Sequence, residues 1–298
     1  MPASRRPVLP TPRRTVSPSW WESGGGYPLA MPASATVYAV ANQKGGVAKT
    51  TTALAVAAAL AERGQAVLAV DLDPQADLTF SLGYDPDSLD PTIHDVLVGR
   101  APLQKTVLQH DEMDVAPSNI DLAGAEVVLL TRTGREYVLR SELEPLRDSY
   151  DSIVIDCPPS LGVLTLNALT AADRVVIPVQ CETLSHRGVS QLLETIVDIQ
   201  RLTNRDLTVA GFIATMYDGR TRHSREVLAD VQSRYDLQLV GVPVRKSIRF
   251  AEAPHGGRSI LASGTQPRGA DAYRIIAAEL AGLDVDPAWR RHADGVAR

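Results

Sequence analysis

Two lysines, Lys44 and Lys49, flank a Gly-Gly pair in the segment ANQKGGVAKTT. A lysine followed by threonine, on a loop that runs into a helix, is typical of a nucleotide phosphate site. Lys49 is placed for the β- and γ-phosphates, and the hydroxyl of Thr50 is placed for Mg²⁺. The usual loop, G-x-x-x-x-G-K-[ST], has glycines where this chain has Gln43 and Ala48. The segment is therefore either a broken phosphate loop or a loop of a different type that needs the additional lysine, Lys44.

The backbone of this loop must come close to phosphate groups. Gly45 and Gly46 allow that approach because they have no Cβ. Ala48 costs little if its φ is helical, because a methyl group is then well tolerated, and it is harmful if its φ is positive. The residues alone leave these two alternatives for Ala48 open.

Two further motifs place aspartates at the ends of apolar segments. VLAVDLDPQ, residues 67–75, delivers Asp71 and Asp73, and SIVIDCPPS, residues 152–160, presents Asp156. Taken alone, the first pair could equally cap a following helix. An acidic residue that ends a buried strand beside a phosphate loop is the Walker B arrangement, which acts on the metal or its water shell. Three motifs in this order, each at a strand end, are unlikely to be a coincidence, and together they predict a nucleotide phosphate site with a metal.

Alternating strand and helix patterns must position these motifs. Strand patterns lie at 37–41, 66–70, around Val115, and at 153–155, 174–179, 209–214 and 239–242. Helix patterns lie at 50–63, ending at the cap candidate Gly64, and near 120–132, 141–149, 163–171, 187–203, 222–235 and 270–282. This order predicts an α/β fold, a doubly wound and mainly parallel sheet with helices on both faces. Ligands bind at the carboxyl ends of such strands, where all three motifs fall.

Composition limits the possible functions. The chain has 298 residues and a net charge of −5, which argues against a uniformly basic nucleic-acid binder. Residues 201–298 nevertheless carry 15 Lys/Arg and 11 Asp/Glu, which suits either a local phosphate-binding patch or scattered solvated side chains. The longest apolar run, 53–61, is too short to span a bilayer. The two cysteines, Cys157 and Cys181, form no disulfide framework or C-x-x-C pair, which favours a reducing cytoplasm.

The chain divides into three regions. Residues 1–35 are rich in Pro, Ser and Arg and lack periodicity, so we expect a disordered tail. MPAS occurs at Met1 and again at Met31, so the second methionine is a candidate start. We expect an ATPase domain at 36–283 and a C-terminal tail at 284–298. A real N-terminal tail could form a basic arm from Arg5, Arg6, Arg13 and Arg14.

Across residues 36–283 the motifs KGGVAKTT, DLDPQ and DCPPS, with TMYDGRTRHS and IRFAEAP, resemble the deviant-Walker-A ATPases of the ParA/Soj chromosome-partitioning family, relatives of MinD. The resemblance implies a P-loop NTPase fold with ATP and Mg²⁺ as cofactors. The implied ATP-binding residues are Lys44, Gly45, Gly46, Val47, Ala48, Lys49, Thr50 and Thr51. The family usually has glycine at the position of Ala48, which puts loop geometry and turnover in question.

The resemblance also implies individual roles. Lys44 would reach across a nucleotide-sandwich homodimer to the phosphates of the partner, which explains the additional lysine. Asp73 would position the attacking water. Asp71 and Asp156 would lie near a magnesium ion that Thr50 also binds. Lys44, Lys49 and Asp73 are therefore the expected catalytic residues.

Three basic residues match family positions that bind DNA without sequence preference: Arg220, Lys246 and Arg249. Arg245 stands where relatives carry proline. The alternative for Arg249 is a surface ion pair with Glu252, three residues away, which would contribute little. The sequence contains no helix-turn-helix or zinc module, so sequence-specific recognition is not expected.

The resemblance predicts a cytoplasmic, nucleoid-associated ATPase that dimerises on ATP, binds DNA in that state and lets go after slow hydrolysis, which a ParB-like partner stimulates. Alternatives are a ParA-like ATPase that positions a protein cargo and an ATP-dependent DNA clamp with negligible turnover. A MinD-like membrane protein should end in an amphipathic helix, and the ending DVDPAWRRHADGVAR has few bulky apolar residues. An iron–sulfur carrier would need cysteine ligands, whereas Cys157 reads as a small buried hydrophobe. A kinase or synthetase would need a substrate pocket.

Overall fold

A computed structural model describes residues 34–182, 186–246, 257–262 and 267–294. The described residues form one six-stranded sheet in the order β3-β2-β4-β1-β5-β6, and every neighbouring pair is parallel. The strands are β1 Thr36–Val40, β2 Val67–Asp71, β3 Asp114–Ala116, β4 Ser152–Asp156, β5 Arg174–Gln180 and β6 Thr208–Thr215. The predicted α/β fold with a parallel sheet is confirmed.

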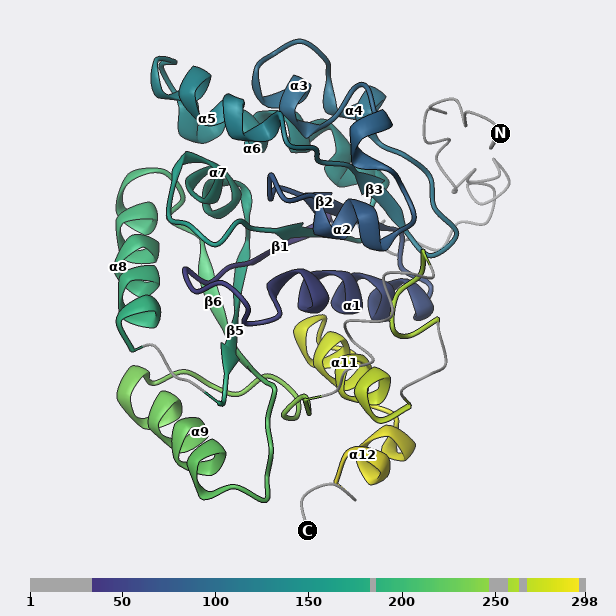
Figure 1. Cartoon of the computed structure of the whole chain (residues 1–298), viewed down its shortest axis with the longest axis vertical. Helices are drawn as coiled ribbons and strands as arrows, with labels where there is room; N and C mark the ends of the chain where they lie inside the picture. The colour runs from purple at the N-terminus through teal and green to yellow at the C-terminus, as the bar shows by residue number, and fades with distance from the viewer. Residues whose placement is uncertain (1–33, 183–185, 247–256, 263–266, 295–298) are drawn as a thin grey trace, which may run out of the picture.

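Helices cover both faces of the sheet (Figure 1). One face carries α1 (Lys49–Glu62) and α11 (Pro267–Leu280), and the other carries α5 (Leu122–Leu130), α6 (Val138–Leu143), α7 (Val163–Ala171) and α8 (His186–Leu202). Successive side chains of β1 alternate between the two cores, because a strand points neighbouring residues to opposite faces. Val37 and Ala39 belong to one buried cluster and Tyr38 and Val40 to the other.

Several short helices escaped the sequence patterns. They are α2 (Asp77–Ser81), α3 (Ile93–Leu97) and α4 (Leu103–Thr106), with the 3-10 helices η1 (Pro86–Ser88) and η2 (Arg135–Tyr137). Each has five residues or fewer, so none repeats its apolar spacing often enough to show a period. The helix α9 (Arg222–Tyr235) has the predicted bounds, and α12 (Pro287–Asp294) lies in the segment that we assigned to a C-terminal tail.

Two predicted elements differ in the structure. The helix predicted at 141–149 is α6, which ends at Leu143, followed by the 3-10 helix η3 (Glu144–Ser149), because Pro145 has no N–H to donate. The strand predicted at 239–242 is wrong: this segment makes only an isolated bridge between Leu239 and Phe212 of β6. Gly241 follows with a φ of 67°, which turns the chain away from an extended path.

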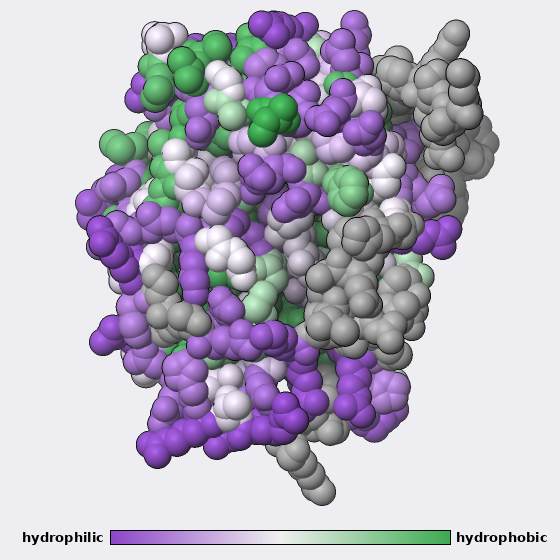
Figure 2. All heavy atoms as spheres, viewed as in Figure 1, coloured by the Kyte–Doolittle hydropathy of each residue, from purple (hydrophilic) through white to green (hydrophobic). Residues whose placement is uncertain are grey.

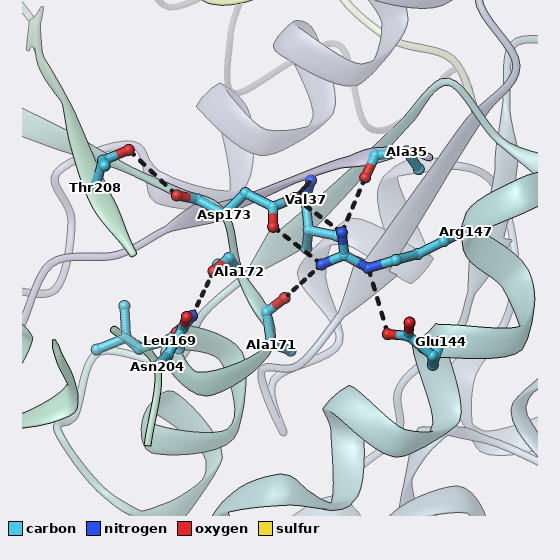
Figure 3. Close-up of polar contacts among 10 residues, drawn as sticks. All are labelled: Ala35, Val37, Glu144, Arg147, Leu169, Ala171, Ala172, Asp173, Asn204 and Thr208. Carbon is cyan, nitrogen blue, oxygen red and sulfur yellow. Dashed lines mark hydrogen bonds and ion pairs between the residues drawn. The ribbon is translucent and has the colours of Figure 1, made fainter. Parts of the chain in front are cut away.

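An ion pair ties together the ends of the strands that lie opposite the predicted site (Figure 3). Arg147 binds Asp173 through two parallel contacts of 3.2 and 3.1 Å and also donates to the carbonyl oxygens of Ala35 and Ala171. Asp173 accepts from the N–H of Val37 at 2.7 Å. The bidentate geometry fixes the start of β1 against β5, so the register of β1 and β5 is set away from the functional end.

Candidate nucleotide-binding site

The three predicted motifs meet at one end of the sheet. Strand β4 lies between β1 and β2, and Asp156 is paired in register with both Val40 and Asp71. The phosphate-loop segment leaves β1 directly after Val40 and runs into α1. Parallel strands bring their carboxyl ends to the same edge, so the loop and the aspartates become neighbours. The prediction that these motifs cluster is confirmed.

Polar contacts brace the loop from several sides. Asn42 donates to the carbonyl oxygen of Pro178 at 2.7 Å and accepts from the N–H of Lys44 at 3.0 Å. Thr215, at the end of β6, donates its hydroxyl to the carbonyl oxygen of Val47 at 3.0 Å. These contacts anchor both halves of the loop to the ends of β5 and β6. The sequence gave no sign of the two distant anchors, because nothing local marks Pro178 or Thr215.

Ala48 adopts the unfavourable one of its two alternatives. It precedes α1 with φ 66° and ψ 39°, in the left-handed region. A residue with a Cβ is strained there by about 1–2 kcal/mol, whereas glycine is not. Gly46 also has a positive φ, 72°, so two residues of one short turn need this conformation. Ala48 therefore holds the conformation that glycine would adopt, at a cost in free energy.

The two lysines of the loop occupy different surroundings. Lys49 is buried, 7% exposed, and its ammonium donates to the carbonyl oxygen of Lys44 at 3.1 Å. Burial lowers the pKa of Lys49, and the nearby charges of Asp156 and Asp73 oppose that shift. The ammonium of Lys44 instead lies 3.2 Å from the side-chain oxygen of Gln180, at the end of β5. Lys49 is therefore buried beside the aspartates, whereas Lys44 contacts the end of β5.

Asp156 is a buried carboxylate with unsatisfied oxygens. Within the described part of the chain, neither oxygen has a hydrogen-bond partner of good geometry. Burial raises the pKa of Asp156 well above its ordinary value, the charge of Asp71 adds to this, and the hydroxyl of Thr50 opposes it. A buried acceptor without a donor is rare and needs a cation, a water or a proton.

The donors around Asp156 suit Mg²⁺. Asp156 and the hydroxyl of Thr50 supply oxygen atoms, which a hard cation requires. No cluster of three or more His, Cys, Asp or Glu of metal-binding arrangement occurs among the described residues. Mg²⁺ is commonly held by one or two protein oxygens together with waters and phosphate oxygens.

Asp71 has protein partners on both of its oxygens, unlike Asp156. One oxygen accepts from the N–H of Asp73 at 3.2 Å, and the other accepts from the N–H and the hydroxyl of Thr79 at 2.8 and 2.6 Å. Burial raises the pKa of Asp71 to about 7 in spite of these hydrogen bonds. Of the two aspartates that we expected near magnesium, Asp156 has acceptor capacity to spare, while Asp71 braces the chain that carries Asp73.

Asp73 faces the loop lysine. It is 8% exposed, and its Oδ1 accepts from the N–H of Gln75 at 3.0 Å. Burial raises the pKa of Asp73, and that hydrogen bond and then the charge of Lys49 lower it. The structure thus places Asp73 and Asp156 close enough to Lys49 for their charges to raise its pKa.

Two of the three predicted DNA-binding residues are described, and each pairs with a carboxylate. Arg220 binds Asp218 through contacts of 2.9 and 2.8 Å, and Lys246 binds Glu182 at 2.9 Å. Hydrogen bonds from Arg220 lower the pKa of Asp218 to about 2. Arg249, with its alternative partner Glu252, lies outside the described residues.

Gln180 and Glu182 were not predicted from the sequence as residues of the site. Gln180 donates to Glu182 at 3.3 Å, and it also accepts from Lys44. Glu182 in turn pairs with Lys246. The position of Gln180 at the carboxyl end of a strand was the signal that could have marked it.

Both cysteines are fully buried. Burial raises the pKa of each thiol, that of Cys181 to about 12. Neither thiol is therefore poised as a nucleophile. None of the described helices is both long enough and apolar enough to cross a bilayer.

A parallel sheet with a phosphate loop after β1 and an acidic residue ending the adjacent β4 defines a P-loop NTPase. Residues 35–209 match the family described as AAA domain. The chain belongs to the ParA/Soj family of partitioning ATPases.

Two curated relatives and one solved structure illustrate the similarity. The sporulation initiation inhibitor protein Soj of Bacillus subtilis is 41% identical over 249 residues, which is 82% of this chain and 98% of Soj. The chromosome partitioning protein ParA of Myxococcus xanthus is 40% identical over 259 residues, 86% of this chain and 91% of ParA. A Mycobacterium smegmatis structure, described as cobyrinic acid a,c-diamide synthase with bound ADP and magnesium, has a TM-score of 0.73 and 52% identity, covering 82% of this chain and 92% of that one.

Proposed function

We propose that this chain is an ATP-dependent partition ATPase that dimerises on ATP, binds DNA non-specifically in the ATP state and is released after hydrolysis. It acts in chromosome or plasmid segregation, with a ParB-like partner that stimulates hydrolysis. One arrangement carries the proposal: a single loop holds two lysines, Lys49 buried beside Asp156, whose carboxylate oxygens are unsatisfied, and Lys44 in contact with the end of β5. The membership of the family supports the same reading.

The loop binds the phosphates of ATP. Backbone N–H groups from Gly45 to Thr51 lie where a loop enters a helix, and that helix end favours anions. Lys49 binds the β- and γ-phosphates with its ammonium. Its side chain is buried at the start of α1, beside the loop that would hold them. Thr50 and Asp156 would hold Mg²⁺, which would supply positive charge against the negative charge that develops on the phosphates. The M. smegmatis relative has ADP and magnesium bound, which supports these cofactors.

Asp73 orients the attacking water. Its Oδ1 accepts from the N–H of Gln75, and its Oδ2 has no protein donor among the described residues, so this atom is available to a water. The raised pKa of Asp73 also makes the carboxylate a better proton acceptor than an exposed one. Asp71 acts indirectly, by holding the backbone of Asp73.

Lys44 completes the site of a second copy. In this chain its ammonium contacts the side-chain oxygen of Gln180 at the end of β5. Arg220, Lys246 and Arg249 supply the DNA surface, and binding there exchanges the carboxylates of Asp218 and Glu182 for phosphates.

A second candidate follows from the M. smegmatis structure, which is described as a diamide synthase. Amide synthesis needs a nitrogen donor, and enzymes that draw ammonia from glutamine use a reactive cysteine. The two cysteines of this chain are buried with raised pKa values, which disfavours that chemistry. Release of glutamate from glutamine by the purified chain, with ATP and a corrinoid acid, would favour the synthase.

Light scattering tests the proposal directly. The wild type is measured with ATP, with ADP and without nucleotide, each with Mg²⁺. We expect a dimer with ATP alone, and DNA binding only in that state. The same oligomer in all three conditions would rule out an ATP-gated sandwich.

A further inference from the structure

Four residues form a closed ring of hydrogen bonds behind the site. The N–H of Asp73 donates to Asp71 at 3.2 Å, and Asp71 accepts the hydroxyl of Thr79 at 2.6 Å. The same hydroxyl oxygen accepts the N–H of Ser118 at 2.9 Å. The hydroxyl of Ser118 then donates to the carbonyl oxygen of Asp73 at 2.8 Å, which closes the ring.

The ring is sealed from solvent. Asp71, Thr79 and Ser118 are each 0% exposed, and Asp73 is 8% exposed. Hydrogen bonds in such surroundings are stronger than at a surface, and a missing partner is more costly. The ring therefore holds its four residues in one arrangement, because any other arrangement would leave a buried polar group without a partner.

The ring holds Asp73 through its backbone. Asp71 accepts a hydrogen bond from the N–H of Asp73, and Ser118 donates one to the carbonyl oxygen of Asp73. The backbone of Asp73 is therefore held at both its N–H and its carbonyl group. The carbonyl of Asp73 also accepts from Ala76, and its Oδ1 from Gln75. These contacts hold the backbone and one carboxylate oxygen of Asp73, and Oδ2 has no protein donor among the described residues.

We propose that Thr79 and Ser118 are positioning residues for hydrolysis, which hold Asp73 so that its carboxylate orients the attacking water. This role rests on the proposed ATPase function. A displacement of about 1 Å in such a group can cost about 10²-fold in rate while substrate binding is kept. The hydroxyls of Thr79 and Ser118 bond to Asp71, to Asp73 and to each other. We therefore expect their replacement to leave the phosphate loop, and with it ATP binding, intact.

The two hydroxyls make different contributions. Thr79 donates to Asp71 and accepts from Ser118 through one hydroxyl oxygen. A valine there leaves the buried N–H of Ser118 without its partner, and Asp71 Oδ2 keeps only the backbone N–H of residue 79. Serine at the same position keeps that hydroxyl oxygen and loses only a methyl group. Ser118→Ala removes the hydrogen bond from the Ser118 hydroxyl to the carbonyl oxygen of Asp73. That carbonyl oxygen still accepts from the N–H of Ala76. Ser118→Ala is thus the milder variant, and it should fold.

The experiment separates turnover from binding. Wild type, Thr79→Val, Thr79→Ser, Ser118→Ala and Asp73→Ala are compared by single-turnover ATP hydrolysis and by equilibrium binding of a fluorescent ATP analogue. Thr170→Val is the matched control, because Thr170 is equally buried and shares a hydroxyl contact of 3.0 Å with Thr203 away from the site. Thermal melting of every variant reports the structural cost.

We expect Thr79→Val and Ser118→Ala to lower the hydrolysis rate about 10- to 100-fold with nucleotide affinity within about 3-fold of wild type. Thr79→Ser should restore most of the rate, and Thr170→Val should lower the melting temperature without changing the rate. Wild-type rates in a folded Ser118→Ala, or a rate loss in Thr170→Val equal to that in Thr79→Val, overturn the positioning role alone. Equal rates in wild type and Asp73→Ala overturn both this role and the proposed function.

Discussion

The ammonium of Lys44 lies 3.2 Å from the side-chain oxygen of Gln180, across the carboxyl ends of β1 and β5. Gln180 donates to Glu182 at 3.3 Å, and Glu182 pairs with Lys246 at 2.9 Å. Two side chains therefore connect the additional lysine of the phosphate loop with a lysine of the proposed DNA surface. If Lys44 turns to the phosphates of a partner protomer, its contact with Gln180 is lost.

Replacing Lys44 tests the sandwich. Lys44→Ala should bind ATP but stay monomeric, because the proposed role of the Lys44 charge is at the phosphates of the partner. Light scattering with ATP measures this, and Lys49→Ala is the comparison variant that should fail at the earlier step of nucleotide binding. A Lys44→Ala protein that dimerises with ATP as wild type does would contradict the role in the partner site.

Replacements of Lys49 and Asp73 separate binding from hydrolysis. Lys49→Ala should abolish ATP binding because it removes a buried charge from the phosphates. Asp73→Ala should bind ATP and fail to hydrolyse it. With no arginine finger assigned, basal turnover of the wild type should be about 10⁻⁴ to 10⁻² s⁻¹, as for unassisted GTPases. Phosphate release measures the rate. Tens of turnovers per second without a partner protein would contradict a slow ATPase whose hydrolysis a partner stimulates.

Ala48→Gly should stabilise the chain. Glycine relieves the strain of a φ of 66°, and its greater freedom in the unfolded chain offsets part of that gain, so we expect about 0.5–1 kcal/mol. In a chain of this size that is a rise of about 1–4 °C in melting temperature. Ala53→Gly, inside α1, is the matched control and should destabilise by about 1 kcal/mol. Equal melting shifts for the two variants would show that Ala48 is unstrained.

The paired aspartates predict a pH dependence of the nucleotide-free protein in EDTA. Burial raises the pKa of Asp71 from 3.8 to about 7 and that of Asp156 in the same direction. From about pH 4 to 7 the folded chain therefore holds protons that the unfolded chain has lost, and the free energy of unfolding falls as the pH rises. Thermal melting between about pH 5 and 8 should show this fall. Asp156→Asn should flatten it, whereas the exposed Asp206→Asn should not.

Much of the site could be predicted because its parts are local. Lys49, Asp73 and Asp156 each follow a short apolar strand in the sequence, and parallel pairing then brings the strand ends together. The sheet was predictable for the same reason, since its strands are continuous apolar runs buried on both faces. The segment at 239–242 looked like another such run, but Gly241 bends it before a ladder can form.

The rest depends on contacts that no local pattern encodes. The positive φ of Ala48 follows from the turn that α1 and the loop impose, and alanine has no intrinsic preference for it. Ser118 lies 45 residues from the aspartate that it holds. Val127, Val128 and Leu130 of α5 are exposed. The apolar residues of this helix have no periodicity that would have marked this exposed apolar surface, which lies at the upper left of the molecule (Figure 2).

The DNA surface gives the last prediction, which links dimerisation to salt. With about four phosphate contacts per protomer, log affinity should fall against log salt with a slope of about −3.6 for a monomer and about −7 for a dimer. Between 50 and 200 mM salt these slopes are losses of about 10² and 10⁴ in affinity, so the ATP dimer should hold DNA where a monomer does not. Anisotropy in the Asp73→Ala background avoids hydrolysis during the measurement. Arg249→Ala and Arg220→Ala should each flatten the slope by about 2 for unrelated sequences alike, while the exposed Arg205→Ala should leave it unchanged. If both variants keep the affinity and slope of the ATP state, DNA is the wrong partner, and a membrane or protein surface takes its place.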